Sequence, residues 1–269
     1  MSAPGGTGYN WAVPSLAPDP ALLDRLDAYY DTVPRAVARA EEVGPFTLFV
    51  RVGEGWPFYA RPRRGARSAI TVDAVERLLE RQRQLGVPRT LEWVHETTPS
   101  LAAAAEQAGL AVSRHQLLVL PATERPAPQP PTGVAVRLVP RDDPAAPAVR
   151  AAVDAAFRGV DDPLDAKDLP VGDPAMRLAG AFEADEPVGG GTHSPRARVT
   201  ELTGIAVLPR ARRRGVAAAL TGALVEDARE EGCDLVFLSA ADASVAAIYS
   251  GLGFVEVATA CVADEVGAA

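Results

Sequence analysis

The segment Val207-Leu-Pro-Arg-Ala-Arg-Arg-Arg-Gly-Val-Ala217 places a basic loop between two apolar patterns. The residues before it, 199–207, predict a strand, and those after it, to about Glu231, repeat apolar side chains every four positions, which predicts a helix. The first turn of a helix leaves backbone N–H groups unpaired, and the helix dipole makes that end positive. The sequence therefore predicts a strand, loop and helix that can hold an anion such as a pyrophosphate.

Small residues shape the start of this helix. Gly215 allows close approach of a bulky anion, and Ala217, after Val216, keeps the surface low. Arg212, Arg213 and Arg214 add positive charge at the rim. An exposed basic turn that only caps the helix is the alternative, and the spacing alone leaves both interpretations open.

Outward from this unit, residues 134–269 show the order strand, helix, three strands, helix, strand, helix, strand. This order predicts a mixed sheet flanked by helices, an α/β (α+β) fold. The strands are expected at 134–139, 176–183, 188–193, 199–207, 235–238 and 254–262, and the helices at 145–157, 216–231 and 244–250.

The N-terminal half has weaker patterns, and a segment with five prolines, 121–133, follows it. Prolines favour a stiff extended connection, so we expect domains at 1–120 and 134–269 with a linker between them. The N-terminal elements are expected as helices at 21–42, 72–85 and 100–108 and strands at 47–52, 56–60, 91–94 and 115–120. Residues 104–112 also align with 246–254, a suggestive internal repeat in alanine-rich sequence.

Two motifs resemble the GNAT superfamily of N-acetyltransferases. Arg212-Arg-Arg-Gly215-Val-Ala217 fits the family's Arg/Gln-x-x-Gly-x-Gly/Ala motif, and Tyr249-Ser-Gly-Leu-Gly253-Phe254 fits its Tyr-x-x-x-Gly-Phe motif. The resemblance covers about residues 134–262 and implies a GNAT fold there. Tandem members of the family have two halves with one active, so residues 1–120 are expected to form a smaller, degenerate GNAT-like domain.

The resemblance also implies roles for individual residues. Tyr249 would protonate the departing thiolate of CoA as general acid. Asp242 stands where the family often has asparagine near the cofactor, and it could instead cap the following helix. Backbone groups would pair with the pantetheine arm, and the basic loop would hold the pyrophosphate. The cofactor-binding set is Ile205, Ala206, Val207, Arg212, Arg213, Arg214, Gly215, Val216, Ala217 and Asp242.

Glu201 is the candidate general base, because some relatives place a glutamate six residues before the valine that ends this strand. By simple alternation it shares a face with Ile205 and Val207, although a β-bulge would change that parity. The alternative is a solvated glutamate at the strand end.

The resemblance thus implies an enzyme that transfers an acetyl or longer acyl group from acetyl-CoA to a primary amine of a small molecule or peptide. A non-catalytic acyl-CoA-binding or sensing module is the alternative. Four carboxylates at Asp161, Asp162, Asp165 and Asp168 could attract a cationic acceptor. The sequence leaves the acceptor and the oligomeric state open, and a homodimer is compatible with the apolar N-terminal half.

Charge and composition exclude other classes of function. Residues 132–269 carry 13 basic and 21 acidic side chains, so we expect no nucleic-acid partner. No apolar run is long enough to cross a membrane, and no secretory signal is visible, which favours a cytoplasmic protein. The two cysteines, Cys233 and Cys261, offer no metal-ligand cluster.

Overall fold

The structure is a computed structural model that describes residues 19–53, 55, 57–66, 68–163 and 173–265. The helices are α1 (Pro20–Arg35), α2 (Val72–Leu85), α3 (Ser100–Gln107), α4 (Ala146–Phe157), α5 (Val216–Glu230) and α6 (Ala243–Ser250), with a 3-10 turn at Pro209–Ala211. The strands are β1 (Ala38–Val43), β2 (Phe46–Arg51), β3 (Arg61–Pro62), β4 (Leu91–Val94), β5 (Leu110–Leu120), β6 (Val134–Val139), β7 (Arg177–Glu183), β8 (Glu186–His193), β9 (Val199–Val207), β10 (Leu235–Ala240) and β11 (Val255–Glu265).

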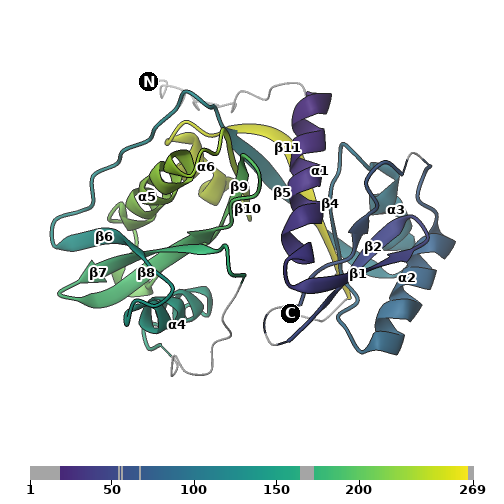
Figure 1. Ribbon diagram of the computed structural model, residues 1–269, viewed down its shortest axis with the longest axis horizontal. Helices are drawn as coiled ribbons and strands as arrows, with labels where there is room; N and C mark the ends of the chain where they lie inside the picture. Colours follow the sequence, from purple (N-terminus) through teal and green to yellow (C-terminus); the bar gives the residue numbers. More distant parts are fainter. Residues whose placement is uncertain (1–18, 54, 56, 67, 164–172, 266–269) are drawn as a thin grey trace, which may run out of the picture.

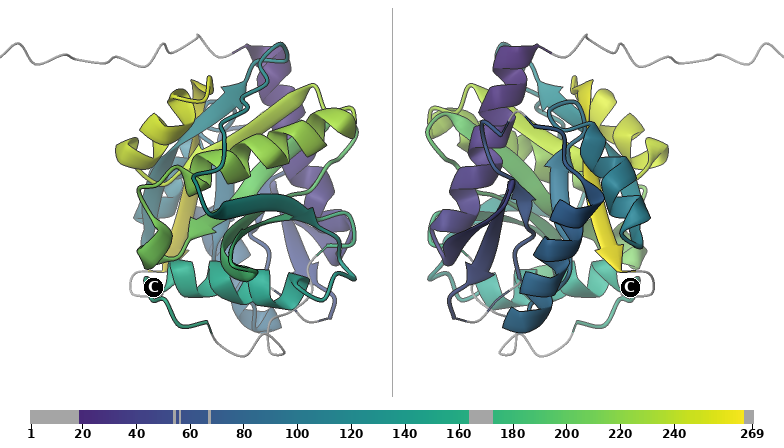
Figure 2. Two further views of the ribbon diagram at one scale, coloured as in Figure 1. Left: turned by 90° about the vertical axis from the view of Figure 1, so that its left-hand side faces the viewer. Right: turned by 90° about the vertical axis from the view of Figure 1, so that its right-hand side faces the viewer.

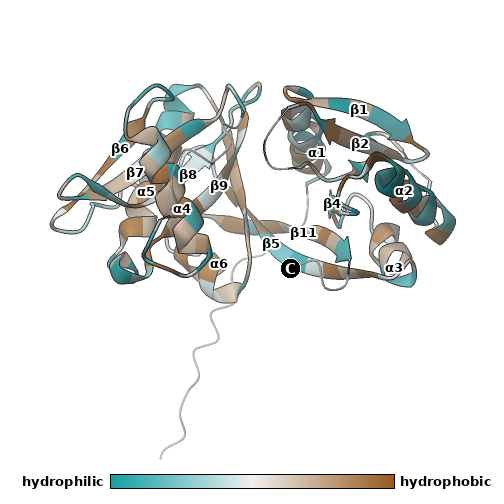
Figure 3. Ribbon diagram, turned by 90° about the horizontal axis from the view of Figure 1, so that it is seen from below, coloured by the Kyte–Doolittle hydropathy of each residue, from teal (hydrophilic) through white to brown (hydrophobic). Residues whose placement is uncertain are grey.

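One continuous sheet joins both halves of the chain. Its eight strands lie in the order β4-β11-β5-β10-β9-β8-β7-β6, and β1, β2 and β3 form a separate small sheet. The long strand β11 lies between β4 and β5, while β5 lies between β11 and β10. Figures 1 and 3 show β5 and β11 running together from one group of elements to the other. Each half therefore inserts one strand into the sheet of the other.

The two halves share a local arrangement. Ala60, just before β3, makes a parallel bridge to Leu91 on β4, with α2 between them in the chain. In the other half β9 pairs in parallel with β10, with α5 between them. A short helix and an 11-residue strand then follow in both, α3 with β5 and α6 with β11. The repeat expected at residues 104–112 and 246–254 lies in these two helix–strand units.

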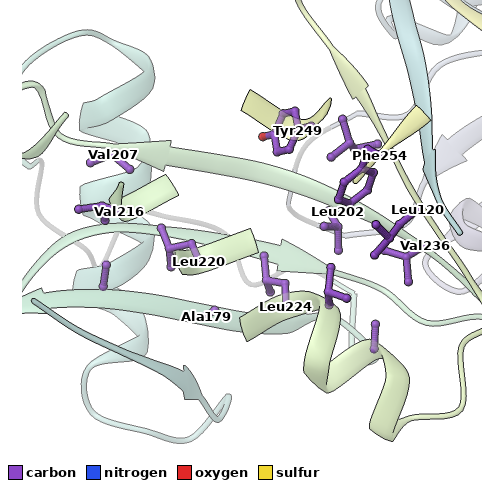
Figure 4. Close-up of a cluster of buried hydrophobic side chains, with 14 of the residues drawn as sticks. Leu120, Ala179, Leu202, Val207, Val216, Leu220, Leu224, Val236, Tyr249 and Phe254 are labelled. Atoms are coloured by element: carbon purple, nitrogen blue, oxygen red, sulfur yellow. The ribbon is translucent and has the colours of Figure 1, made fainter. Parts of the chain in front are cut away.

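Apolar side chains cover both faces of the large sheet. On one face, α5 and α6 pack over Leu120, Leu202 and Val236, and Figure 4 shows this core. On the other face, α1 packs on β5, β10 and β11, and α4 lies over β7 and β8. Figure 2 shows α4 and α5 separated by the strands β6 to β8. The site described below lies where β9 and β10 meet these layers.

The C-terminal elements follow the predicted order, and the main errors fall in the N-terminal half. The helix expected at 21–42 ends at Arg35, and residues 38–43 form β1 instead, because they pair antiparallel with β2. Of the strand expected at 56–60, the described residues 57–60 contain only the single bridge at Ala60. The strand expected at 115–120 begins five residues earlier, since β11 pairs with it from Leu110 to Val119.

The proline-rich segment 121–133 contains no helix or strand. It crosses α5, where Pro128 leaves no room for a side chain at Gly222, and Arg229 donates to the carbonyl of Pro121 at 2.9 Å. The segment is therefore packed against the C-terminal half, and the division of the chain into two domains around it stays a prediction.

Candidate functional site

The strands β9 and β10 pair over a short distance and then separate. Their parallel register runs only from Val199 opposite Leu235 to Glu201 opposite Phe237. Beyond this point β10 continues to pair with β5, while β9 continues to pair with β8. The edge of β9 from Leu202 to Val207 therefore has no strand partner on the β10 side among the described residues.

A β-bulge in β9 decides which side chains face which layer. Gly204 has a φ of 63°, and the register with β8 shifts between Gly190 and Thr192. As a result Ile205 and Val207 join Leu202 in the core under α5. Glu201 faces the α1 side instead, so the expectation from simple alternation, which placed Glu201 with Ile205 and Val207, is wrong.

The helix α5 begins at the open end of β9 with free backbone donors. Gly215, its N-cap, has a φ of 91° and empty space where a side chain would be. No side chain caps this end, and the N–H groups of Val216 and Ala217 have no acceptor among the described residues. This is the arrangement that binds anions at helix N-termini, and it lies at the predicted positions.

The three arginines predicted at the rim, directly before Gly215, have different contacts. Arg212 turns inward, and its guanidinium donates to the carbonyls of Val207 at 2.9 Å and Ala156 at 2.7 Å, which fixes the loop to β9 and α4. Arg214 pairs with Glu183 at 2.6 Å. Arg213 is exposed, has a φ of 58°, and makes no ion pair with any described residue. Of the predicted rim charges, Arg213 is thus the one left available to a ligand.

Tyr249 lies on α6, on the same face of the sheet as α5. Its side chain is 9 % exposed and its ring meets Phe254 edge to face, with centroids 5.9 Å apart. Figure 4 shows its hydroxyl pointing away from Phe254, and no described residue is hydrogen-bonded to it. Burial raises the pKa of this phenol, so it is protonated at neutral pH and can donate.

Glu201 is surrounded by residues of the N-terminal half. Its carboxylate accepts a hydrogen bond from the hydroxyl of Tyr30 at 3.1 Å. Burial, and then the charge of Glu92, raise the pKa of Glu201 to about 8, although Arg61 and the Tyr30 hydroxyl act in the opposite direction. A carboxylate with this pKa can take a proton from an amine near neutral pH.

Sequence analysis missed these three neighbours of Glu201. Tyr30 lies 171 residues from Glu201 in the chain, in a helix that is amphipathic and carries no motif. The one available signal was the pair of aromatic residues Tyr29 and Tyr30, which pack edge to face on Phe237 with centroids 5.2 Å and 5.4 Å away.

Two other polar residues have structural roles. Asp242 is the N-cap of α6 and accepts from the backbone N–H groups of Ser244 and Val245 at 2.8 Å and 3.0 Å, so the cap alternative describes its contacts. His193 is fully buried between Thr200 and Asp227, at 3.1 Å and 2.7 Å, on the face away from Glu201.

The expected acidic loop is only partly described. Asp161 accepts from the backbone N–H of Arg210 at 3.0 Å, which ties it to the basic loop. Asp162 is described, whereas Asp165 and Asp168 lie outside the described residues. No group of three potential metal ligands is present among the residues that the structure describes. Within the same residues, no helix is long and apolar enough to cross a membrane.

Comparisons with solved structures show the same fold over most of the chain. A GCN5-related N-acetyltransferase from Kribbella flavida has a TM-score of 0.72 at 22% identity, covering 91% of this chain and 96% of that one. A tandem GNAT protein from the clavulanic acid biosynthesis pathway has a TM-score of 0.52 at 16% identity, covering 93% and 89%. A GCN5-related N-acetyltransferase-like protein from Streptococcus suis has a TM-score of 0.52 at 10% identity, covering 91% and 98%.

At the level of sequence, no curated protein matches the chain. A family model does match: residues 147–254 fit the acetyltransferase (GNAT) family. The matched segment contains the end of β9, the uncapped start of α5 and Tyr249. The match to the GNAT acetyltransferase family therefore lies within the C-terminal half of this chain, at residues 147–254.

Proposed function

We propose that the protein transfers an acetyl group from acetyl-CoA to a primary amine. The observation that carries this proposal is the separation of β9 from β10 directly before the uncapped N-terminus of α5. The free edge of β9 at Ile205, Ala206 and Val207 would pair with the amides of the pantetheine arm. The N–H groups that follow Gly215, with the charge of Arg213, would hold the pyrophosphate.

The residues near this opening suit the two proton transfers of the reaction. The amine nitrogen forms a bond to the thioester carbonyl carbon, and the carbon–sulfur bond breaks. Glu201 takes the proton that the nitrogen loses, directly or through water, and Tyr249 gives a proton to the leaving thiolate. The two groups lie on opposite faces of the sheet, so the gap between β9 and β10 is where donor and acceptor would meet. Placing the two reactants together supplies much of the rate increase.

The position of Glu201 indicates the side from which the acceptor enters. Its side chain faces α1, so the amine would approach between α1 and the β9 edge while CoA lies on the α5 side. The pocket beside Tyr30 is lined by Asp27 and Asp31 but also by Arg61, Arg63 and Arg64, so the proposal of an amine acceptor rests on Glu201 as the group that takes its proton. A small-molecule or peptide amine fits this requirement.

A thiol-release assay tests the proposal. Acetyl-CoA is incubated with the protein and a panel of polyamines, aminoglycosides and peptides, and free CoA is measured. Amine-dependent release with at least one member is expected. Binding of acetyl-CoA without release across the panel would support the alternative, a non-catalytic acyl-CoA-binding module. Absence of both binding and release would contradict the proposed site itself.

A further inference from the structure

The hydrogen bond from Tyr30 to Glu201 joins the two halves of the chain at the candidate base. Tyr30 is 5 % exposed, and its hydroxyl donates to Oε1 of Glu201 at 3.1 Å. Its ring packs edge to face on Phe237, the register partner of Glu201 on β10. The ring is therefore held against the same part of the sheet that carries the carboxylate.

Two further residues hold Tyr30 from the other side. The guanidinium of Arg61 lies over the Tyr30 ring, 4.0 Å from its centroid. Arg61 also forms an ion pair with Glu92 on β4, and both side chains of that pair are largely buried. The three elements α1, β3 and β4 thus each contribute one side chain to a cluster of Tyr30, Arg61 and Glu92, which we call the base clamp.

We propose that the base clamp positions the Glu201 carboxylate for catalysis, with Tyr30 as the residue that holds it and Arg61 and Glu92 as the pair that holds Tyr30. This inference rests on the proposed function, in which Glu201 is the base. It gives the N-terminal half a part in the active site, as the supplier of positioning residues for the catalytic half.

The members of the base clamp have opposite effects on the ionisation of Glu201, so the proposal can be tested. The Tyr30 hydroxyl and the Arg61 charge favour the ionised carboxylate of Glu201, whereas the Glu92 charge disfavours it. Among the other nearby groups, Tyr29 donates to the carbonyl of Ser194 and contacts the backbone of Glu201, not its carboxylate, and Asp27 lies beside Arg61. From β8, His193 points to the opposite face, where Asp227 binds it.

Removing single members should therefore move the titration of Glu201 in opposite directions. Tyr30→Phe removes a donor to the carboxylate, so the pKa of Glu201 should rise above its value of about 8. Glu92→Gln removes a negative charge and frees Arg61, so that pKa should fall. Tyr29→Phe is the matched control, because it removes a neighbouring hydroxyl that donates to the carbonyl of Ser194 and makes no hydrogen bond to the Glu201 carboxylate, so the midpoint should stay close to that of the wild type.

The titration can be measured without knowing the acceptor. Carbon-13 NMR of the full chain, labelled at the glutamate side-chain carboxyl, is recorded across pH, and the Glu201 signal is the one lost in Glu201→Gln. A midpoint that rises in Tyr30→Phe, falls in Glu92→Gln and stays in Tyr29→Phe supports the base clamp. Melting temperatures of all variants show whether each one is folded at the pH values used.

The two proposals fail in different ways. An unmoved midpoint in both folded clamp variants, or shifts in the same direction, would overturn the clamp even if the wild type releases CoA with an amine. If the two variants shift the midpoint in opposite directions but the wild type binds no acetyl-CoA and releases no CoA, the proposed acetyl transfer is wrong. The base clamp would then stand as a cluster that only holds Glu201. With an active acceptor in hand, the acid limb of kcat/KM should move with the midpoint in each variant.

Discussion

The helices α2 and α5 occupy corresponding places in the two halves, but only α2 begins with a side-chain cap. Thr71 caps α2, and its hydroxyl accepts from the N–H of Ala74 at 3.3 Å. Before α5 stands Gly215, which offers no side chain to the helix. Because the cap occupies the N–H of Ala74 and Asp73 adds a negative charge to the first turn, we expect the start of α2 to suit a pyrophosphate less than the start of α5 does.

The loops before these helices also differ in whether their arginines are paired. Arg63 and Arg64, ahead of α2, pair with Glu42 and Asp24 at 2.8 Å each. Arg213, ahead of α5, pairs with no described residue. At the other end of each half, Gln107 is an exposed amide, whereas Tyr249 is a buried phenol with a protonated hydroxyl. The two halves thus share a layout but differ in the caps and side chains at the positions where we propose the site.

The largest expected effect is on stability, and it compares the side chains that hold α5 and α2 to the rest of the fold, Asp227 and Gln82. Asp227, on α5, accepts from Arg177 at 2.6 Å through both oxygens and from His193. Asp227→Ala leaves both partners without their carboxylate, and the free energy of unfolding should fall by about 3 kcal/mol. Gln82→Ala in α2, which loses one bond to the carbonyl of Thr90, should cost about 1 kcal/mol. Urea unfolding measures both, and equal losses would contradict the difference in anchoring.

The next effect is on cofactor binding. Gly215→Glu puts a side chain into the left-handed backbone region and an anion into the space proposed for the pyrophosphate. Affinity for acetyl-CoA in calorimetry should fall by about 100-fold, roughly 2.7 kcal/mol. Gly65→Glu makes the same change at another glycine with positive φ, in the loop before α2, and should leave the affinity as it is. Comparable losses in both variants would show that the two loops are not distinguished as we propose.

A smaller effect, on turnover, is expected from substitutions at the aligned positions of the short helices α6 and α3. Tyr249→Phe removes the proposed proton donor and should lower kcat by about 10–100-fold with little change in KM for acetyl-CoA. Gln107→Ala, at the aligned position in α3, should leave both constants unchanged. Steady-state CoA release at several acetyl-CoA concentrations separates the two constants. Full turnover in Tyr249→Phe would assign the proton transfer to water.

The last effect is a pH dependence of stability at Glu201. Its folded-state pKa of about 8 lies above the ordinary 4.5, so the folded chain holds this proton longer than the unfolded chain. The contribution of Glu201 to stability therefore declines as pH rises from about 4.5 to 8. Glu201→Gln removes this decline, and its melting temperature should exceed that of the wild type by about ten degrees at pH 8 and by much less at pH 5. Glu226→Gln on the exposed side of α5 serves as control, and a gain independent of pH would count against the assignment.

Local patterns predicted the C-terminal elements, and long-range contacts explain what they missed. The boundaries of β9 and the start of α5 follow from alternation, periodicity and one glycine. The strand exchange between β5 and β11, by contrast, pairs residues such as Leu110 and Glu265 that share no local signal. The inward turn of Arg212 was missed for the same reason, because its acceptor at Ala156 lies in another helix. The sequence indicated only that a β-bulge would change which face Glu201 lies on. Whether the bulge forms at Gly204 depends on the register with β8, which the local sequence does not determine.

The stoichiometry of acetyl-CoA binding tests the central claim most directly. Calorimetry of the wild-type chain with acetyl-CoA should give one site per chain, and that site should be lost in Gly215→Glu but kept in Gly65→Glu. Two sites per chain, or one that survives Gly215→Glu and disappears in Gly65→Glu, would contradict the assignment of the cofactor to the C-terminal half.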